Sequence, residues 1–381
     1  MSLAKEGAAV AVKTTSLIKK ARVVFVEKIK ATGGKAISVQ GSVTSPEQID
    51  RFFSETEKQL GNANVLVNNA GVFAYLPLQD VNEKEFHRQF DLGVMSSLSS
   101  FAGKVAVVTG ASRGIGKGIA TVRGEQRATV YVTGRMTATT PDATSGTIHE
   151  VAQGITAAGG VGIAVQCDHA HDGQIKALFE KVKAEQGHLD ILVNNATTIG
   201  ADPFAPPPFW NKSLAIADQF IVGLRSAFVA SYYAAPLLVA ADKALVVNIS
   251  YYGAVSYHLD PAYGATKAGL DKLTFDMAQD FEPYGVAVVS LWPGPTATER
   301  ASFLISRIPG GDKILENSET PKFSGLAIAW LYTDPKLMSK SGNVVIAAEA
   351  ALEYGFADSN GRQPRSLREQ KGSPRPFFKK G

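Results

Sequence analysis

The chain has 381 residues, a formal net charge of +4 and a hydrophobic fraction of 45%. This length suffices for two average domains or for one large domain with an appendage, and the composition is typical of a soluble globular protein. The single cysteine, Cys167, excludes an intramolecular disulfide and favours a reducing compartment.

The two ends and the longest apolar run carry further expectations. The first ten residues lack the basic start and long apolar core of a secretory signal, so we expect a cytoplasmic protein. The longest uncharged run, 226–241, is shorter than a membrane-spanning helix, which predicts a buried helix and no integral membrane segment. Residues 363–381 are rich in Arg, Lys and Pro, which predicts a basic, disordered tail. A basic tail alone is weak support for nucleic-acid binding, and none is predicted.

The first elements of the chain belong to an internal repeat. Residues 31–71 align without a gap with residues 157–197, an offset of 126 that joins Gly33 to Gly159 and Asn68 to Asn194. In each copy a short apolar run is followed by a stretch with helical spacing and by a continuously apolar run, which predicts strand, helix and strand. This alternation predicts an α/β fold, a Rossmann-type doubly wound parallel sheet preceded by an incomplete second copy of itself.

The first copy, residues 1–100, lacks both the beginning and the end of the second. In a doubly wound sheet the missing first strand lies at the centre, so the fragment would leave strand edges that need a partner. We expect it to pack poorly, to borrow a strand or to dock on the complete domain. A fusion remnant without function is the favoured interpretation.

The second copy begins with a strand, a glycine-rich turn and a helix start over residues 103–120. Gly110, Gly114 and Gly116 permit a tight turn and a close approach to a pyrophosphate, which the free N–H groups of a helix start would bind. A tight turn without a ligand is the alternative, which the position between strand and helix disfavours. The helix itself looks weak, because Thr121 and Val122 are β-branched and Gly124 costs about 1 kcal/mol relative to alanine.

Tyr263 and Lys267 lie four residues apart, so a helix places them on one face. A neighbouring ammonium group would stabilise the phenolate and lower the pKa of the tyrosine, which suits proton exchange near neutral pH. A surface pair is the alternative for these two residues alone. Ser250 precedes Tyr263 by 13 residues (263 − 250).

Five motifs together resemble the short-chain dehydrogenase/reductase family. They are "TGASRGIG" (109–116), "NNAT" (194–197), Ser250 in "NISYYG", "YGATK" (263–267) and "WPGPTAT" (292–298), and they follow the family's order. Residues 101–362 are similar to the branch containing dehydrogenase/reductase family member one. Residues 3–100 are similar to a slice of a 3-oxoacyl-carrier-protein reductase.

The resemblance implies a role for each matched residue. Tyr263 would exchange a proton with the substrate oxygen, Ser250 would hydrogen-bond that oxygen, and Lys267 would hold the nicotinamide ribose. The hydride would come from the cofactor. The residues implied to contact the dinucleotide are Gly110, Ser112, Arg113, Gly114, Ile115, Gly116, Arg135, Asp168, Asn195, Ala196, Tyr263, Lys267, Pro293, Gly294, Thr296 and Thr298. Asp168 could equally be a helix N-cap. No metal site is predicted.

The charge beside the glycine turn favours NADP(H) over NAD(H). Folds that bind NAD place an acidic residue about 20 positions after the glycines, whereas here Arg135 stands 19 after Gly116 (135 − 116) and Arg113 lies in the turn. Merely solvated arginines are the alternative. Two departures from the family concern Gly223, where an active-site asparagine is usual, and Thr197, where a glycine is usual. Both weaken the expectation of turnover more than that of the fold.

The sequence thus predicts an NADP(H)-dependent oxidoreductase that interconverts a carbonyl and a secondary alcohol. Its enzyme body spans residues 101–362, and the resemblance implies a homodimer or homotetramer formed through the central helices. The alternatives are a dinucleotide-binding protein that has lost turnover and an interaction module made of the truncated copy and the basic tail. The substrate is not specified by the sequence.

Overall fold

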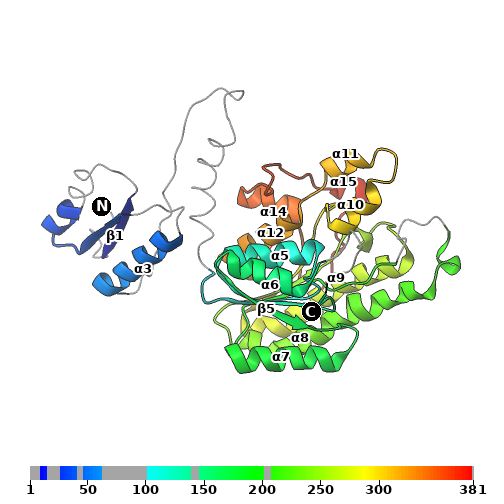
Figure 1. Ribbon diagram of the computed structural model, residues 1–381, viewed down its shortest axis with the longest axis horizontal. Coiled ribbons are helices and arrows are strands. Elements are labelled where there is room, and N and C mark those ends of the chain that lie inside the picture. Colours follow the sequence, from blue (N-terminus) through cyan, green and yellow to red (C-terminus); the bar gives the residue numbers. More distant parts are fainter. Residues whose placement is uncertain are drawn as a thin grey trace. The chain divides into compact units, whose positions relative to one another are not determined.

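The computed structural model describes residues 9–14, 26–40, 46–61, 101–138, 146–200 and 207–379. The chain divides into two compact units, residues 1–100 and residues 101–381 (Figure 1).

The second unit is built on a seven-stranded sheet. Its strands are β3 (Val105–Val108), β4 (Thr129–Gly134), β5 (Val161–Gln166), β6 (Ile191–Asn194), β7 (Ala244–Ile249), β8 (Val286–Trp292) and β9 (Val344–Ile346). Their order is β5-β4-β3-β6-β7-β8-β9, and every neighbouring pair is parallel. This confirms the predicted α/β doubly wound fold. The order reverses between β3 and β6, which makes the carboxyl ends of these two strands the expected place for a ligand.

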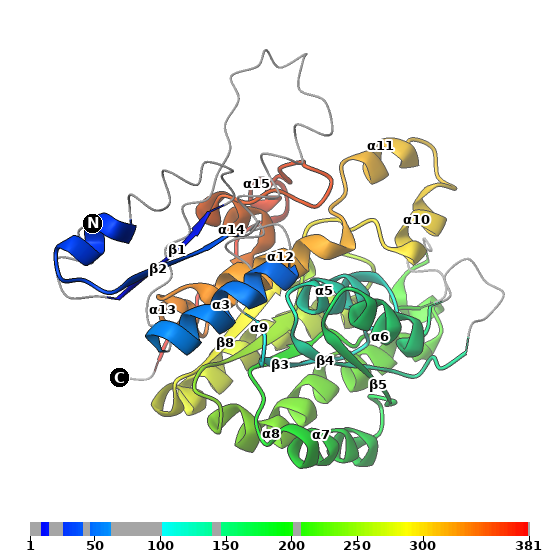
Figure 2. The same ribbon diagram turned by 60° about the vertical axis from the view of Figure 1, so that its left-hand side comes forward.

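Helices cover both faces of this sheet (Figures 1 and 2). One face carries α5 (Gly114–Glu125), α6 (Ile148–Ala157) and α12 (Pro321–Thr333), and the other carries α7 (Asp172–Gln186), α8 (Ser226–Val239) and α9 (Pro261–Phe281). Alternate residues of one strand enter the two cores: Val108 packs on the first face and Val107 on the second. Strands buried on both sides need largely apolar runs, which explains why β3 is apolar throughout and why β6 and β7 are apolar apart from Asn194 and Asn248.

Shorter helices complete the second unit. They are η2 (Phe209–Asn211), η3 (Leu214–Ala217), the π-helical η4 (Phe220–Arg225), η5 (Tyr252–Ala254), η6 (Glu282–Tyr284), α10 (Glu299–Ile305), α11 (Gly311–Glu316), α13 (Leu337–Lys340), α14 (Ala347–Tyr354) and α15 (Arg368–Lys371).

The glycines of α5 have a packing role that was not predicted from the sequence. A Cβ on Gly118 would run into the backbone carbonyl of Pro321, at the start of α12. A Cβ on Gly124 would lie 2.6 Å from a methyl group of Ile155, on α6. Their low helix propensity therefore accompanies close contact with both neighbouring helices.

The helix expected to be buried over 226–241 is buried on one face alone. Ala230, Ala234 and Leu238 of α8 enter the core, whereas Phe228 and Tyr232 are 51% and 66% exposed. Among the described residues, the continuous helical stretch Leu214–Val239 is long and apolar enough to cross a membrane by length and composition. That finding is weak, because the core helix of a soluble protein passes the same test.

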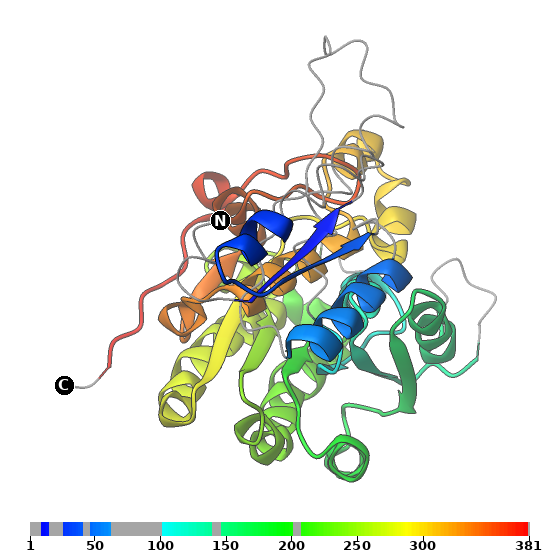
Figure 3. The same cartoon turned by 90° about the vertical axis from the view of Figure 1, so that its left-hand side faces the viewer.

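The C-terminal segment differs from the predicted disordered tail. In its described part, residues 363–379, the Leu367 N–H donates to the Tyr252 hydroxyl (2.9 Å) and Arg368 forms an ion pair with Glu349 (2.6 Å). The Phe377 ring packs 5.5 Å from that of Phe275 on α9. Figure 3 shows the course of the C-terminal segment, in red, toward the C-terminus. The average composition of the segment predicts a disordered basic tail. A few apolar side chains and specific ion pairs nevertheless attach it to the domain.

The first unit reproduces part of the second. It contains β1 (Val10–Thr14), β2 (Ala36–Gln40), α3 (Pro46–Leu60) and helical residues 26–31. The bounds of α3 and α7 are both 126 residues apart (172 − 46 and 186 − 60). Strand β1 pairs with β2 in parallel, as β4 pairs with β5. The strand predicted over 64–71 lies outside the described residues, so the expectation of a borrowed strand stays a prediction.

Candidate active site

The turn after β3 and the turn after β6 are hydrogen-bonded together at the point where the strand order reverses. The Thr109 hydroxyl accepts from the backbone N–H groups of Asn195 and Ala196, both at 2.9 Å. The Asn195 amide donates back to the carbonyls of Thr109 (2.8 Å) and Gly110 (3.0 Å). Motifs that lie 85 residues apart in the chain are thereby brought side by side.

The three predicted glycines serve this packing. Gly110 and Gly114 have φ of 63° and 61°, a region that favours glycine. A Cβ on Gly110 would lie 2.8 Å from the Ala196 Cα, and one on Gly116 would overlap the Asn195 amide. Ser112 is buried and Ile115 packs partly against the core.

The start of α5 binds an acidic side chain. The Gly114 N–H donates to Glu299 Oε2 at 2.8 Å, and Lys117 lies 3.5 Å from the other carboxylate oxygen. A carboxylate held by a helix N-terminus shows that the turn accepts an anion, as it would have to for a pyrophosphate. The predicted dinucleotide therefore fits this turn, provided that Glu299 moves aside.

The predicted catalytic residues lie together at the start of α9 and the end of β7. Asp260 caps the helix by accepting from the Tyr263 N–H (2.9 Å). The Lys267 ammonium donates to the Ile249 carbonyl (2.9 Å) and lies 5.5 Å from the centre of the Tyr263 ring. Ser250 follows Ile249, and its hydroxyl donates to the Lys267 carbonyl (3.0 Å).

The electrostatics of this cluster correct one expectation. Burial raises the pKa of Tyr263, and the nearby Tyr251 and Asp260 add to the rise. Burial also lowers the pKa of Lys267, to about 8. The predicted lowering of the tyrosine pKa by the lysine is therefore wrong for this arrangement, because the cost of burying a phenolate dominates. Tyr263 is therefore a neutral phenol in this arrangement.

The loop after β8 lies against the glycine turn. Pro293 and Gly294 are buried, and the Thr296 hydroxyl donates to the Gly294 carbonyl (3.0 Å). The Thr298 hydroxyl caps α10 by accepting from the Ala301 N–H (3.1 Å), while its methyl lies beside Gly114. The loop implied to contact the dinucleotide thus borders the glycine turn.

The corner after β4 adjoins the glycine turn and carries Arg135. The Ala111 N–H donates to the Thr133 carbonyl (2.9 Å), so the glycine turn lies beside the end of β4, where Arg135 follows. Arg135 and Asp168 approach to 4.0 Å. Asp168 accepts from the Ala170 N–H (3.0 Å), and α7 begins later with His171 as its N-cap, so the N-cap alternative for Asp168 is wrong.

Comparison with known proteins decides the family. A family model described as short chain dehydrogenase matches residues 1–102 and 104–307, and so covers both units. The chain belongs to the short-chain dehydrogenase family.

Relatives of this short-chain dehydrogenase include dehydrogenase/reductase SDR family member 1 of mouse (37% identical) and of human (38% identical). Each match covers 68% of this chain and 84% of the relative. Among solved structures, a short chain dehydrogenase from Mycobacterium thermoresistibile superposes with a TM-score of 0.58 at 25% identity, covering 68% of this chain and 89% of that one. A mutant of a Serratia marcescens short-chain dehydrogenase/reductase gives 0.53 at 28% identity, covering 65% and 96%. The family binds an NAD(P) dinucleotide, and this chain carries an oxidoreductase fold of that family.

The departures from the family pattern are linked in space. Gly223 lies in the π-helical η4, and a Cβ there would be 2.7 Å from a methyl group of Thr266 and 3.4 Å from the Thr197 hydroxyl. An asparagine at position 223 would therefore displace Thr266. In this dehydrogenase, Thr197 and Thr266 occupy the space beside Gly223.

Sequence reasoning missed two buried acids near the site. Asp271 accepts from the Ser290 hydroxyl (2.6 Å) and the Trp292 indole (3.1 Å), and it faces Lys267. Burial raises the pKa of Asp271. Its spacing, four residues after Lys267, could have revealed it. Glu319 lies against the loop after β8, and nothing in its local sequence marks it.

The aromatic residues around Tyr263 divide into core and surface. Tyr251 packs 6.4 Å and His258 packs 5.5 Å from the Tyr263 ring, between ring centres. Tyr252 is fully buried against Trp292, and Tyr257 is largely exposed. Tyr251 and His258 are therefore the aromatic neighbours that flank the Tyr263 ring.

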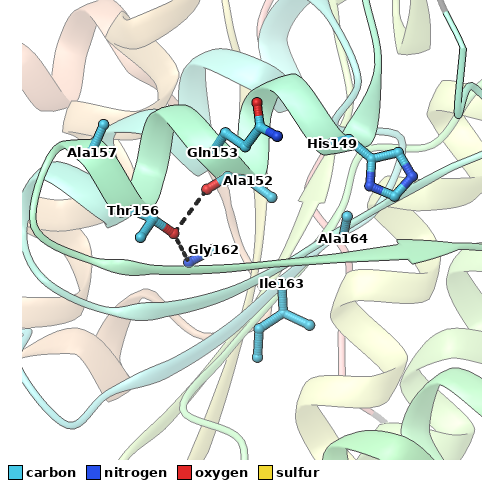
Figure 4. Close-up of a pocket in the computed structure, with 8 residues that line it drawn as sticks. All are labelled: His149, Ala152, Gln153, Thr156, Ala157, Gly162, Ile163 and Ala164. Atoms are coloured by element: carbon cyan, nitrogen blue, oxygen red, sulfur yellow. Dashed lines mark hydrogen bonds between the residues drawn. The ribbon is translucent and has the colours of Figure 1, made fainter.

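A hollow is found elsewhere on the described part of the second unit. It has a volume of about 740 Å³ between α6 and β5, and Figure 4 shows its lining, which includes His149, Gln153 and Thr156. None of the predicted site residues lines it.

Replacing Glu299 by glutamine is expected to tighten NADPH binding about twofold to fivefold. The variant removes a negative charge from the turn that must receive the pyrophosphate, and such charges at helix starts are worth roughly 0.3–1 kcal/mol. The measurement is NADPH fluorescence titration at low ionic strength. Glu316→Gln, on an exposed residue of α11, is the control, and equal affinities for the two variants would contradict the expectation.

Proposed function

We propose that the chain is an NADP(H)-dependent oxidoreductase that interconverts a carbonyl compound and a secondary alcohol, with Tyr263 as the general acid and base. The observation that carries the proposal is the meeting of Ser250, Tyr263 and Lys267 at the end of β7, stabilised by the hydrogen bonds from Ser250 to Lys267 and from Lys267 to Ile249.

The chemistry follows from these side chains. The neutral phenol of Tyr263 donates its proton to a carbonyl oxygen in the direction of reduction and takes it back in oxidation. The Ser250 hydroxyl, which donates to the Lys267 carbonyl in this arrangement, would turn to donate to the same oxygen. Lys267, the cation of the cluster, stabilises negative charge that develops on the phenol oxygen. A bound dinucleotide would supply the hydride.

The choice of NADP(H) is supported by the cations at the end of β4. Arg135 follows this strand at the position where an NAD-binding fold carries an acid, and Arg113 belongs to the adjoining turn. Guanidinium groups suit a 2′-phosphate because they donate several hydrogen bonds in a fixed plane.

Replacing Arg135 by glutamine is expected to lower the ratio of NADPH to NADH affinity about tenfold. The loss of one charge-assisted contact with a phosphate is worth roughly 1.5 kcal/mol, which corresponds to that factor. Titration of both dinucleotides measures the ratio. Lys176→Gln, which removes a cation from the exposed face of α7, is the matched control. An unchanged ratio of NADPH to NADH affinity in Arg135→Gln would oppose the choice of NADP(H).

The test of the function itself is NADPH consumption against a panel of ketones, aldehydes and quinones. Turnover establishes the oxidoreductase. Tight dinucleotide binding without turnover would instead favour the binding protein that the Gly223 and Thr197 departures suggest.

The exposed face of α8 is our proposed surface for a homodimer or homotetramer. Phe228 and Tyr232 lie in ring contact on that face, 6.5 Å apart, and leave an apolar area uncovered. Light scattering of the purified chain tests this proposal, which a monomer at micromolar concentration would contradict.

A further inference from the structure

Glu319 is a buried carboxyl group attached to the loop after β8. Its side chain is 2% exposed, and its Oε1 accepts from the Gly294 N–H at 2.8 Å. Its backbone is joined to the same loop twice: its N–H donates to the Pro295 carbonyl (2.7 Å), and its carbonyl accepts from the Ala297 N–H (2.9 Å). One residue thus makes three of the loop's hydrogen bonds.

The approach of the carboxyl group to the loop requires the glycine. A Cβ on Gly294 would lie 2.7 Å from Glu319 Oε1. Gly294 is therefore in direct contact with the carboxyl group, which determines the position of the glycine.

The environment of Glu319 favours the uncharged acid. Among the described residues, Glu319 Oε2 is buried and has no hydrogen-bond partner. The groups that face it are acids, Asp358 and the phenols of Tyr251 and Tyr252. Burial raises the pKa of Glu319 to about 8, the Asp358 carboxylate raises it further, and the Gly294 N–H opposes the rise.

The residues on each side of Glu319 are hydrogen-bonded to residues 358–362. Asp358 accepts from the Thr320 N–H (2.7 Å), and Arg362, the cation on this side, donates to the Ser318 carbonyl (2.9 Å). The backbone of Glu319 is therefore anchored on both sides. The Gly294 N–H favours the carboxylate, but an ionised Oε2 would be buried without a partner among the described residues, so ionisation drives the side chain toward water and away from Gly294.

We propose that Glu319 is a positioning residue for the dinucleotide: its uncharged carboxyl group holds Gly294 and the 293–298 loop in the conformation that receives the dinucleotide, and its ionisation loosens that loop. This inference rests on the proposed function and on the contacts with the dinucleotide that the family resemblance implies for Pro293, Gly294, Thr296 and Thr298.

The test follows NADPH affinity with pH in the full chain. For the natural sequence, the Kd should rise about tenfold between pH 7 and pH 9, because a group with a pKa near 8 must be protonated to bind. In Glu319→Gln, whose amide reproduces the uncharged acid, most of this rise should disappear. Glu316→Gln, an equal loss of charge from an exposed side chain, should keep it. Lys267 titrates in the same range in all three proteins, so the difference between them isolates Glu319.

A second measurement needs no dinucleotide. The pKa of Glu319 in the fold exceeds its ordinary value near 4.5, so the stability it contributes is fully present below pH 4.5 and is lost as the pH rises toward 8. As the pH rises from 5 to 8, the melting temperature of the natural protein should therefore fall relative to that of Glu319→Gln.

The outcomes separate the two proposals. A rise of Kd with pH that is equally steep in Glu319→Gln and in the natural chain, both folded by circular dichroism, overturns the inference and leaves the oxidoreductase intact. A chain that binds no dinucleotide at any pH overturns the proposed function, and the inference with it.

Discussion

Replacement of Tyr263 by phenylalanine is expected to lower kcat for carbonyl reduction by about 10²- to 10⁴-fold, the usual contribution of a positioned general acid. The ring should stay in place, because it packs against Gly253, Tyr251 and His258 and because Lys267 lies 5.5 Å from its centre. The affinity for NADPH should then change less than about threefold, since the energy lost belongs to the transition state.

The phenol of Tyr251 supplies the control. It lies beside Tyr263, and burial raises its pKa to about 12. Tyr251→Phe should lower kcat less than tenfold if Tyr263 is the acid. Steady-state rates with one ketone, measured beside NADPH titrations, give both quantities. Similar losses of kcat in the two variants would refute the assignment, and so would Tyr263→Phe turnover within tenfold of the natural chain.

The features that the sequence predicted are those encoded by local spacing. The ungapped repeat placed α3 and α7 at matching positions, and the glycine turn was expected between a strand and a helix, where β3 and α5 are found. Tyr263 and Lys267 needed only the helical period to share a face. Each of these signals can be read from the order of residues along the chain, so no knowledge of the packing was required.

The features that escaped prediction depend on segments far apart in the chain. Glu319 reaches Gly294 across 25 residues (319 − 294), and neither position looks unusual alone. The pKa of Tyr263 depends on how deeply the whole domain buries it, which no spacing reveals. The C-terminal segment was judged by its average composition, whereas Leu367 and Phe377 decide where it packs. Gly118 and Gly124 looked unfavourable by propensity, because propensity ignores the helix that lies against them.

Replacing Gly118 by alanine is expected to destabilise the protein by about 2–3 kcal/mol, although alanine is the better helix former. The added methyl would meet the Pro321 carbonyl, which is backbone and cannot rotate away, so α5 and α12 must separate. That separation would also disturb the glycine turn at the start of α5, so NADPH affinity should fall with stability.

Gly154→Ala on α6 is the matched control, because its methyl would meet no atom within 4 Å and should stabilise by up to about 1 kcal/mol. Urea unfolding of the three proteins measures the difference. Equal midpoints for Gly118→Ala and Gly154→Ala would show that the contact between α5 and α12 is not close enough to require glycine.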